Sequence, residues 1–370
     1  MESQARRPCR VILSMVALAV FAAVVAWGLG GPGGVAGRTY DKAVAAAEVG
    51  DWATAFSGFR QVAAVDPTFR DTAEQVGLAA GHLLGEGAED LSVDVEVDLL
   101  RWLVDQGDLG RLVAVLDHSM VEVPAGWDIM GSNDGPANEQ PARTVYLNEF
   151  TIDRYEVTNA QYDRYLRHSG EPAPVYWTTG TYPAGQSDHP VLGVSWRQAN
   201  DYCGWAGKRL PTEAEWERAC RGPAGLTYPW GDAWDPTLVN TAVYPIPDLD
   251  DLWPLLTQGM PAGDASPQPI GSHPDGASPY GVLDLCGNAS EWVADWYDPN
   301  AYTQLPVENP IGEEPPWNHS VRGSAWLTPH QTDGYVADIS RCGFRNASHS
   351  YDDPRVGFRC ATSRHHPADR

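Results

Sequence analysis

The segment from Val194 to Cys220 constrains the fold most, because it specifies two short helices placed one after the other. Ser195 and Gln198 have the spacing of a capping box, in which the hydroxyl accepts a hydrogen bond from a first-turn amide and the glutamine side chain reaches back. Thr212 and Glu215 repeat that spacing at the start of the second helix. Each helix would bury one face of aromatic, alanine and cysteine side chains: Trp196, Ala199, Cys203 and Ala206 on the first, and Trp216, Ala219 and Cys220 on the second.

The composition narrows the class of protein. With 370 residues, 43% of them hydrophobic, the chain can bury a sizeable core and has room for two domains. An excess of 49 acidic over 25 basic residues excludes a nucleic-acid partner, which needs a basic surface. The 30 prolines, 37 glycines and 15 tryptophans indicate a loop-rich body with many buried indoles instead of a helical bundle.

The N-terminal region predicts a membrane anchor. The run Val11–Leu29 is apolar and long enough to span a bilayer, and Arg6, Arg7 and Arg10 precede it. The positive-inside rule then predicts a cytoplasmic tail over residues 1–10 and an extracytoplasmic remainder. A cleaved signal peptide is the alternative, although the run is long for one and no clean small-x-small site follows. We expect a single-pass membrane protein.

Residues 30–118 are predicted to be a linker followed by helices. Gly50, Trp52, Phe59 and Pro67 stand at spacings that resemble the second half of a tetratricopeptide repeat. One repeat cannot close a solenoid, because three or more are needed to bury a continuous core. A stalk or packing element is the preferred interpretation, and a partner-binding helical module is the alternative.

From about residue 119 to residue 366 the chain changes to short strands and turns, with landmarks that occur in a fixed order. They are Met130-Gly131, Glu139-Gln140-Pro141, Glu156–Asn159, Val194–Cys220, Tyr228–Gly231, Tyr280–Asp284, Gly287–Trp296 and Gly357–Arg359. This ordered set resembles the formylglycine-generating enzyme family, also called the sulfatase-modifying factor family. The resemblance implies an α+β, C-type-lectin-like domain with unusually little regular secondary structure.

The resemblance also implies two disulfides. Secreted members pair cysteines at the positions of Cys203 with Cys360 and of Cys220 with Cys342. Each bridge would close more than a hundred residues, worth roughly 4 to 5 kcal/mol in the chain-entropy model. The alternative is four reduced, buried thiols. Cys286 is then left without a partner and is expected to pack as a small hydrophobe.

A structural calcium ion is a further implication of the resemblance. Asn240 matches a ligand of the family's first calcium site, and Asn288 with Glu291 matches the second. Asp264 is the candidate for the aspartate of the first site. Oxygen donors of this kind suit a hard cation. The alternative is that these side chains satisfy backbone groups of the loops.

The catalytic pattern of the family is broken in this chain. Catalytic members oxidise a cysteine of a sulfatase-type peptide with two copper-binding cysteines, whose soft thiolates suit Cu(I). Thr328 and Ala337 stand at those two positions, and Ala325 replaces the accompanying serine. No cysteine lies between Cys286 and Cys342. We therefore expect neither copper at this place nor formylglycine generation by the known chemistry.

Two functions remain after the loss of those cysteines. The preferred one is a non-catalytic binding or scaffold protein that holds a peptide, glycan or envelope protein partner. Its groove is expected near five side chains, namely Trp326, Arg322, Arg341, Trp292 and His330.

The alternative is an oxidoreductase with a histidine and carboxylate iron site in the loop 328–341. Relatives in ergothioneine and pyoverdine pathways run other oxidations, and this loop contains His330, Asp333 and Asp338. No two histidines stand one helical turn apart, so the sequence favours the binding protein.

Overall fold

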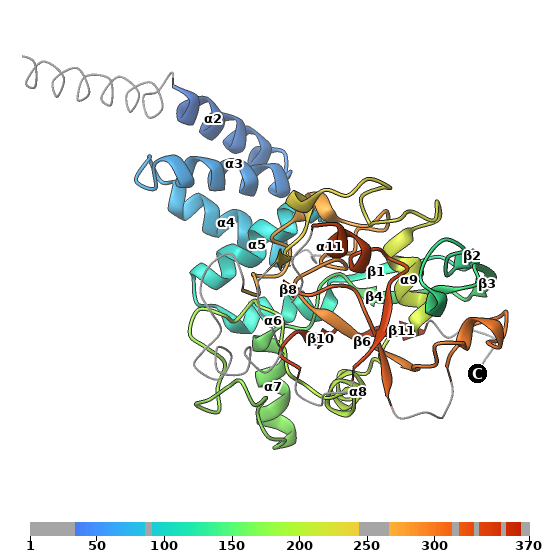
Figure 1. The fold of residues 1–370 in the computed structure, drawn as a ribbon. Helices are drawn as coiled ribbons and strands as arrows, with labels where there is room; N and C mark the ends of the chain where they lie inside the picture. The colour runs from blue at the N-terminus through green and yellow to red at the C-terminus, as the bar shows by residue number, and fades with distance from the viewer. Residues whose placement is uncertain are drawn as a thin grey trace, which may run out of the picture. The chain divides into compact units, whose positions relative to one another are not determined.

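The computed structural model describes residues 34–85, 91–243, 266–312, 318–328, 333–348 and 353–363. The chain divides into two compact units, one up to Trp102 and one from Leu103 onward (Figure 1). Each unit is described by itself below.

The first unit is helical. It contains α2 (Val35–Glu48), α3 (Trp52–Val65), α4 (Thr72–Gly85) and most of α5 (Val93–Asp105). The Asp51 side chain caps α3 by accepting from the amide of Thr54. Tyr40 packs edge-on against Phe59 and Phe69, with ring centroids 5.4 and 5.7 Å apart. The expected helices are present, but the resemblance to a tetratricopeptide repeat gains no support and stays a prediction.

The predicted single-pass membrane localisation is corrected here. In the part of the chain that the structure describes, no helix is both long and apolar enough to cross a bilayer. The longest of these helices have 14 residues, whereas a span needs about 20. The run Val11–Leu29, on which the anchor was predicted, lies outside the described residues.

The second unit combines short helices with short strands. Its helices are α6 (Leu109–His118), α7 (Asn159–Ser169), α8 (Trp196–Trp205), α9 (Glu213–Arg221) and α11 (Asp333–Ile339). Its strands are β1 (Met120–Val123), β2 (Gly126–Met130), β3 (Arg143–Leu147), β4 (Phe150–Asp153), β5 (Ala242–Val243), β6 (Ser290–Trp296), β7 (His319–Arg322), β8 (Leu327–Thr328), β9 (Arg345–Ala347), β10 (Val356–Phe358) and β11 (Ala361–Ser363).

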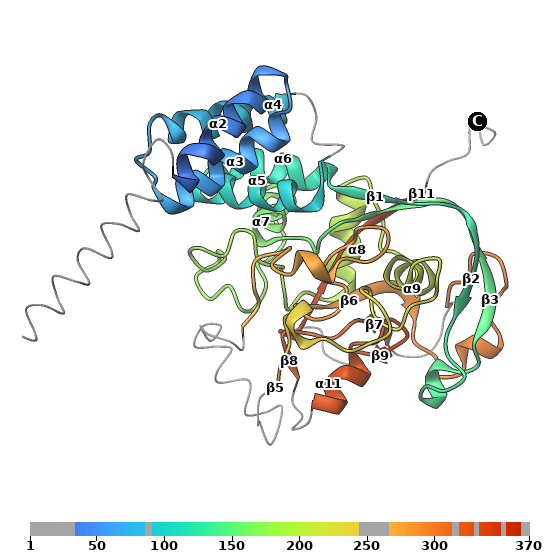
Figure 2. The same cartoon turned by 90° about the horizontal axis from the view of Figure 1, so that it is seen from above.

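The strands form two larger sheets and two strand pairs. One sheet has the order β1-β4-β11 and the other the order β10-β6-β7-β9, while β2 pairs with β3 and β5 with β8. Figure 2 shows the β2–β3 ribbon at one edge of this unit. The last two strands join opposite sheets, since β10 runs parallel to β6 and β11 antiparallel to β4. The mixed helix and sheet architecture with brief elements is the one expected.

The helix starts follow the sequence closely. Capping boxes open α8 at Ser195 and α9 at Thr212, as predicted, and a third opens α7 at Thr158. In each box the side-chain hydroxyl accepts from the third helical amide, and the glutamine or glutamate there accepts from the cap amide. The two helices of the organising segment are therefore fixed locally.

Both predicted disulfides are present. Cys203 of α8 is bonded to Cys360, with Cα atoms 5.7 Å apart, and Cys220 of α9 to Cys342, with Cα atoms 5.6 Å apart. They close 157 and 122 residues of chain, for which the chain-entropy model gives roughly 5 kcal/mol each. They tie the two capped helices to the last quarter of the chain.

Candidate functional site

A surface pocket of about 470 Å³ lies where the end of α9 meets the turn after β2 and the end of α11. Four contributions form its wall: the turn after β2, the last residue of α9 and the loop behind it, one residue of α11, and the segment that follows α11. The lining residues are Ser132, Asp134, Gly135, Pro136, Arg221, Thr227, Asp338 and Arg341. Its wall is therefore charged and polar.

Buried carboxylates hold both arginines of this pocket. Arg341 donates two hydrogen bonds to the enclosed carboxylate of Glu139, at 2.7 and 2.9 Å. Arg221 forms an ion pair with Glu217 at 2.9 Å. A side chain at Gly135 would collide with the Glu139 carboxylate, so the glycine leaves room for this pair.

The remaining charges of the pocket are negative. Asp134 and Asp338 line it in addition to the two arginines; Glu139 pairs with Arg341, and Glu217 is shared by Arg221 and Arg322. The wall itself has two carboxylates and two guanidinium groups, and the carboxylates of Glu139 and Glu217 behind it make the surroundings of the pocket more negative than positive. A cationic group suits such a wall, because opposite charges attract more strongly at a partly enclosed site than in open solvent.

Three of the side chains predicted to line a groove lie in the interior, which corrects that expectation. Trp326 is fully buried, and its indole nitrogen donates to the carbonyl of Pro354. Trp292 is buried and donates to the carbonyl of Val194. Arg322 has no exposed surface. Their size and polarity suggested a binding surface, but each has its hydrogen-bond partners inside the fold.

Of the other two, Arg341 lines the pocket and His330 lies outside the described residues. The remaining pocket residues were not predicted as ligand contacts, apart from Asp338, which was assigned to an iron site. They come from segments distant in the chain and carry no local motif, so no signal in the sequence brings them together.

The acidic residues of α9 organise the interior behind the pocket. Glu217 accepts from Arg322 at 2.8 Å, and Glu213 accepts from Arg345 at 2.8 Å. Burial opposes the ionisation of Glu213, but the charges of Arg345 and Arg322 outweigh burial and lower its pKa. The indole of Trp216 donates to Glu291 at 2.8 Å. The glutamates of the organising segment are therefore structural.

The model of the sulfatase-modifying factor enzyme 1-like domain matches residues 110–364. The chain belongs to this family. Inactive C-alpha-formylglycine-generating enzyme 2 of Mus musculus is 31% identical over 322 residues, which cover 73% of this chain and 94% of that protein. PvdO from Pseudomonas aeruginosa has a similar structure, with a TM-score of 0.50 at 25% identity over 66% of this chain and 94% of that chain.

A relative with a different name shares the same region. Serine/threonine-protein kinase pkn1 of Chlamydia caviae is 32% identical over 261 residues, or 65% of this chain. The chain spans only 37% of the length of that relative. The similarity is therefore to one part of a longer protein.

The structure places the positions at which catalytic family members are expected to carry cysteine. Thr328 ends β8, and Ala337 lies in α11 beside the pocket residue Asp338. The hydroxyl of Tyr228 donates to the carbonyl of Ala337 at 3.2 Å, which fixes α11 at the edge of the pocket. The pocket thus adjoins one of the two altered positions.

The predicted iron site falls largely on residues that are not described. His330 and the side chain of Asp333 lie outside the described residues. Within the described ranges, no group of three or more histidine and carboxylate side chains has its ligand atoms close enough together to share a metal ion.

The side chains of Asn288 and Glu291, which were predicted to bind calcium, have hydrogen-bond partners within the protein. The side-chain oxygen of Asn288 accepts from Asn240 and from the amide of Gln268, each at 2.9 Å. Both oxygens of Glu291 accept from Arg359 at 2.7 Å. As arranged, Asn288 and Glu291 do not fit a calcium ion, and Asp264 lies outside the described residues.

An oxygen donor that suits a cation better lies near Asn288 and Glu291, and the sequence did not predict it. The carboxylate of Glu156 is buried, and its Oε1 atom has no hydrogen-bond partner. Burial, with the nearby charge of Asp284, raises the pKa of Glu156 well above its usual range. Burial also raises the pKa of Asp284, which accepts from the amide of Gly271 at 2.7 Å. Such carboxylates would gain from a cation or a proton.

Proposed function

We propose that this chain is a non-catalytic member of its family, which binds a peptide segment with a basic side chain in the pocket beside α11. The observation that carries the proposal is an open polar pocket with two aspartates in its lining next to Ala337, where a catalytic relative is expected to have a copper-binding cysteine. The chain would keep the recognition part of the fold without the oxidising centre.

Two observations support the absence of family catalysis. Neither Thr328 nor Ala337 offers a thiolate, and a two-thiolate copper site cannot be formed without them. The murine relative at 31% identity is itself named as inactive. We therefore infer a binding or scaffold role for this chain.

The pocket's chemistry favours a basic peptide over a glycan. Its described lining contains no aromatic ring, and it includes the carboxylates of Asp134 and Asp338, of which Asp338 is near the guanidinium group of Arg341. The arginines are held by Glu139 and Glu217, so they are less available for an anionic ligand. A lysine or arginine side chain can pair with Asp338 while the peptide backbone contacts the polar wall.

The test compares the affinities of two peptides and two variants by isothermal titration calorimetry. One peptide has a central arginine, and its matched partner has glutamate in that place. Asp338→Asn should weaken binding of the arginine peptide by about tenfold, since a charged hydrogen bond contributes roughly 1.5 kcal/mol. Asp201→Asn, on the exposed face of α8, is the control and should change nothing. Two results would contradict the proposal: equal affinity of the wild-type protein for the two peptides, or equal affinity of the two variants for the arginine peptide.

We also propose a calcium ion that takes its oxygens from the buried carboxylates of Glu156 and Asp284. What supports it is the unpartnered Glu156 Oε1 atom and the excess negative charge around it. The ion would be structural, because both carboxylates are enclosed.

A further inference from the structure

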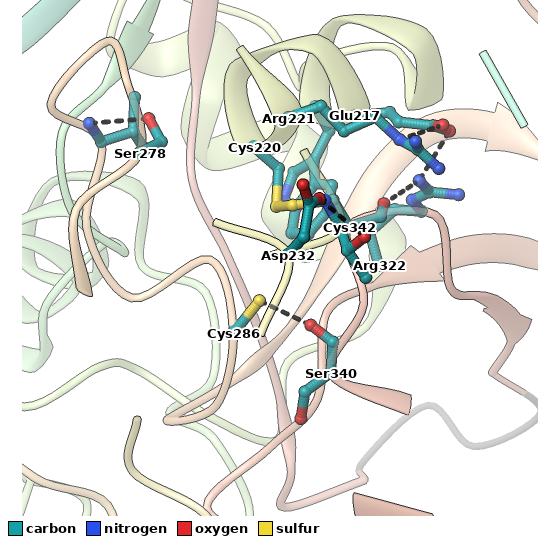
Figure 3. Close-up of a disulfide and its surroundings, with 12 residues drawn as sticks. Glu217, Cys220, Arg221, Asp232, Ser278, Cys286, Arg322, Ser340 and Cys342 are labelled. Carbon is teal, nitrogen blue, oxygen red and sulfur yellow. Dashed lines mark hydrogen bonds and ion pairs between the residues drawn. A yellow bond between two sulfur atoms is a disulfide. The ribbon is translucent and has the colours of Figure 1, made fainter. Parts of the chain in front are cut away.

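Three sulfur atoms gather at one point in the interior of the second unit. The Sγ atoms of Cys220, Cys286 and Cys342 all lie within 4.8 Å of one another, and all three residues are buried. Cys220 and Cys342 are joined as a disulfide, and Cys286 is a free thiol. Figure 3 shows the Cys286 side chain directed toward that disulfide. In the described ranges, this is the one group of potential metal-ligand side chains so closely spaced.

The free thiol is kept inert while the disulfide is closed. The Cys286 thiol donates a hydrogen bond to the carbonyl of Ser340 at 2.7 Å (Figure 3). Burial, with the charge of Glu291, raises the pKa of this thiol. Because only the thiolate attacks a disulfide or binds a metal, Cys286 does neither in the oxidised protein at neutral pH.

Reduction changes the cluster from one thiol into three. A dithiol would deliver two electrons and two protons to the Cys220–Cys342 bond, and would itself become a disulfide. Three thiolates bound at about 2.3 Å to one metal ion stand roughly 4 Å from each other. The Cys286 sulfur already lies within 4.8 Å of the other two, whereas the sulfurs of Cys220 and Cys342, now bonded to each other, must move apart to reach that arrangement.

We propose that the reduced form of this chain binds one Cu(I) ion through Cys220, Cys286 and Cys342. Each thiol releases its proton to solvent as its sulfur binds the ion, and the copper stays in the Cu(I) state. Soft thiolates select Cu(I), whereas Zn(II) in protein sites prefers four ligands and this cluster offers three. The site is distinct from positions 328 and 337 and does not depend on the proposed peptide binding.

Two arginines are chain neighbours of the cysteines in this cluster. Arg221 and Arg341 follow Cys220 and precede Cys342 directly in the chain, and both line the pocket. Three thiolates with one Cu(I) carry two negative charges, which these neighbouring guanidinium groups reduce only in part, because Glu217 and Glu139 already pair with them.

Competition with a chromophoric Cu(I) chelator tests the site. The full chain is reduced with excess dithiothreitol, desalted without oxygen and titrated with Cu(I). Cys286→Ser is the matched variant, because the serine hydroxyl can still donate to Ser340 and the four cysteines of the two disulfides are unchanged. The variant should bind Cu(I) at least roughly 100-fold more weakly, since a direct ligand contributes more than the outer-shell partners for which such losses are known. The oxidised wild-type protein should take up no ion here.

Two further measurements check that copper is bound by three sulfurs and that the reduced protein stays folded. X-ray absorption of the wild-type complex should give three sulfur neighbours around copper, and near-ultraviolet circular dichroism should show that the reduced protein keeps its tertiary structure. Equal affinity in Cys286→Ser would overturn the proposal. A two-sulfur shell, uptake by the oxidised protein or unfolding on reduction would do the same.

Discussion

Buried charges in this chain are of two kinds, and the difference decides which residues respond to solution conditions. Arg322, Arg345 and Arg359 are enclosed, and buried glutamates meet each of them. Glu156 has instead the carboxylate of Asp284 as its strongest charged neighbour. The first kind is balanced within the fold, whereas the second leaves excess negative charge in the interior.

The imbalance at Glu156 predicts a linked dependence on pH and calcium. Its raised pKa means that the folded protein holds a proton at a pH where the unfolded chain has released it. The contribution of Glu156 to the free energy of unfolding should therefore rise as the pH is lowered from neutral to mildly acidic, because protonation removes the buried charge. Calcium at about 100 times its dissociation constant should add about 2.7 kcal/mol near neutral pH, where it replaces that proton.

Thermal unfolding with calcium or with a chelator, at neutral and at mildly acidic pH, measures how the stability depends on calcium and on pH. Glu156→Gln removes the charge and should abolish the response to calcium, while Glu48→Gln, exposed at the end of α2, should keep it. A wild-type protein that ignores calcium, or a Glu156→Gln variant that still responds to it, is the contrary result.

At the scale of elements, the short helix α9 positions a cap, two buried glutamates and a disulfide cysteine. Its N-terminal cap fixes where it begins, and Glu215 completes the box and pairs with Arg209. Glu213 and Glu217 then reach the interior arginines, and Cys220 anchors its last turn to Cys342. Loss of the cap would loosen the first turn, on which the later contacts depend.

Thr212→Ala should lower the free energy of unfolding by about 1 kcal/mol, because the amide of Glu215 loses its hydroxyl acceptor. Denaturant unfolding of the two proteins measures the difference. Thr178→Ala, at an exposed loop threonine, is the control and should stay within about 0.5 kcal/mol of wild type. A Thr212→Ala variant as stable as the control would show that tertiary contacts alone hold α9.

At the scale of the whole molecule, the sequence predicted what depends on local patterns or on ordered motifs. The capping boxes follow from residues three apart, and both disulfides follow from the family pattern. The pocket did not follow, because its walls come from segments about two hundred residues apart, such as those of Asp134 and Asp338. Trp326 was placed at a surface because a large indole suits either a groove or a core, and only the fold distinguishes them.

The arrangement of Glu291 could not be predicted from the sequence, for a similar reason. Its partner Arg359 is 68 residues away, and nothing local reveals that the guanidinium occupies both carboxylate oxygens. The unpartnered oxygen of Glu156 likewise appears only when loops far apart in the chain are brought together.

The most direct test of the central claim, that this chain binds basic peptides without modifying them, is to identify the peptides that it retains from a mixed library. The library contains cysteine peptides of sulfatase type and peptides with basic, acidic and apolar centres, and copper is supplied throughout. Mass spectrometry of the bound fraction should show enrichment of peptides with lysine or arginine, all with unchanged masses. A cysteine peptide recovered with the mass of its aldehyde, or a bound fraction without basic enrichment, would contradict the account of this chain as a non-catalytic binder of basic peptides.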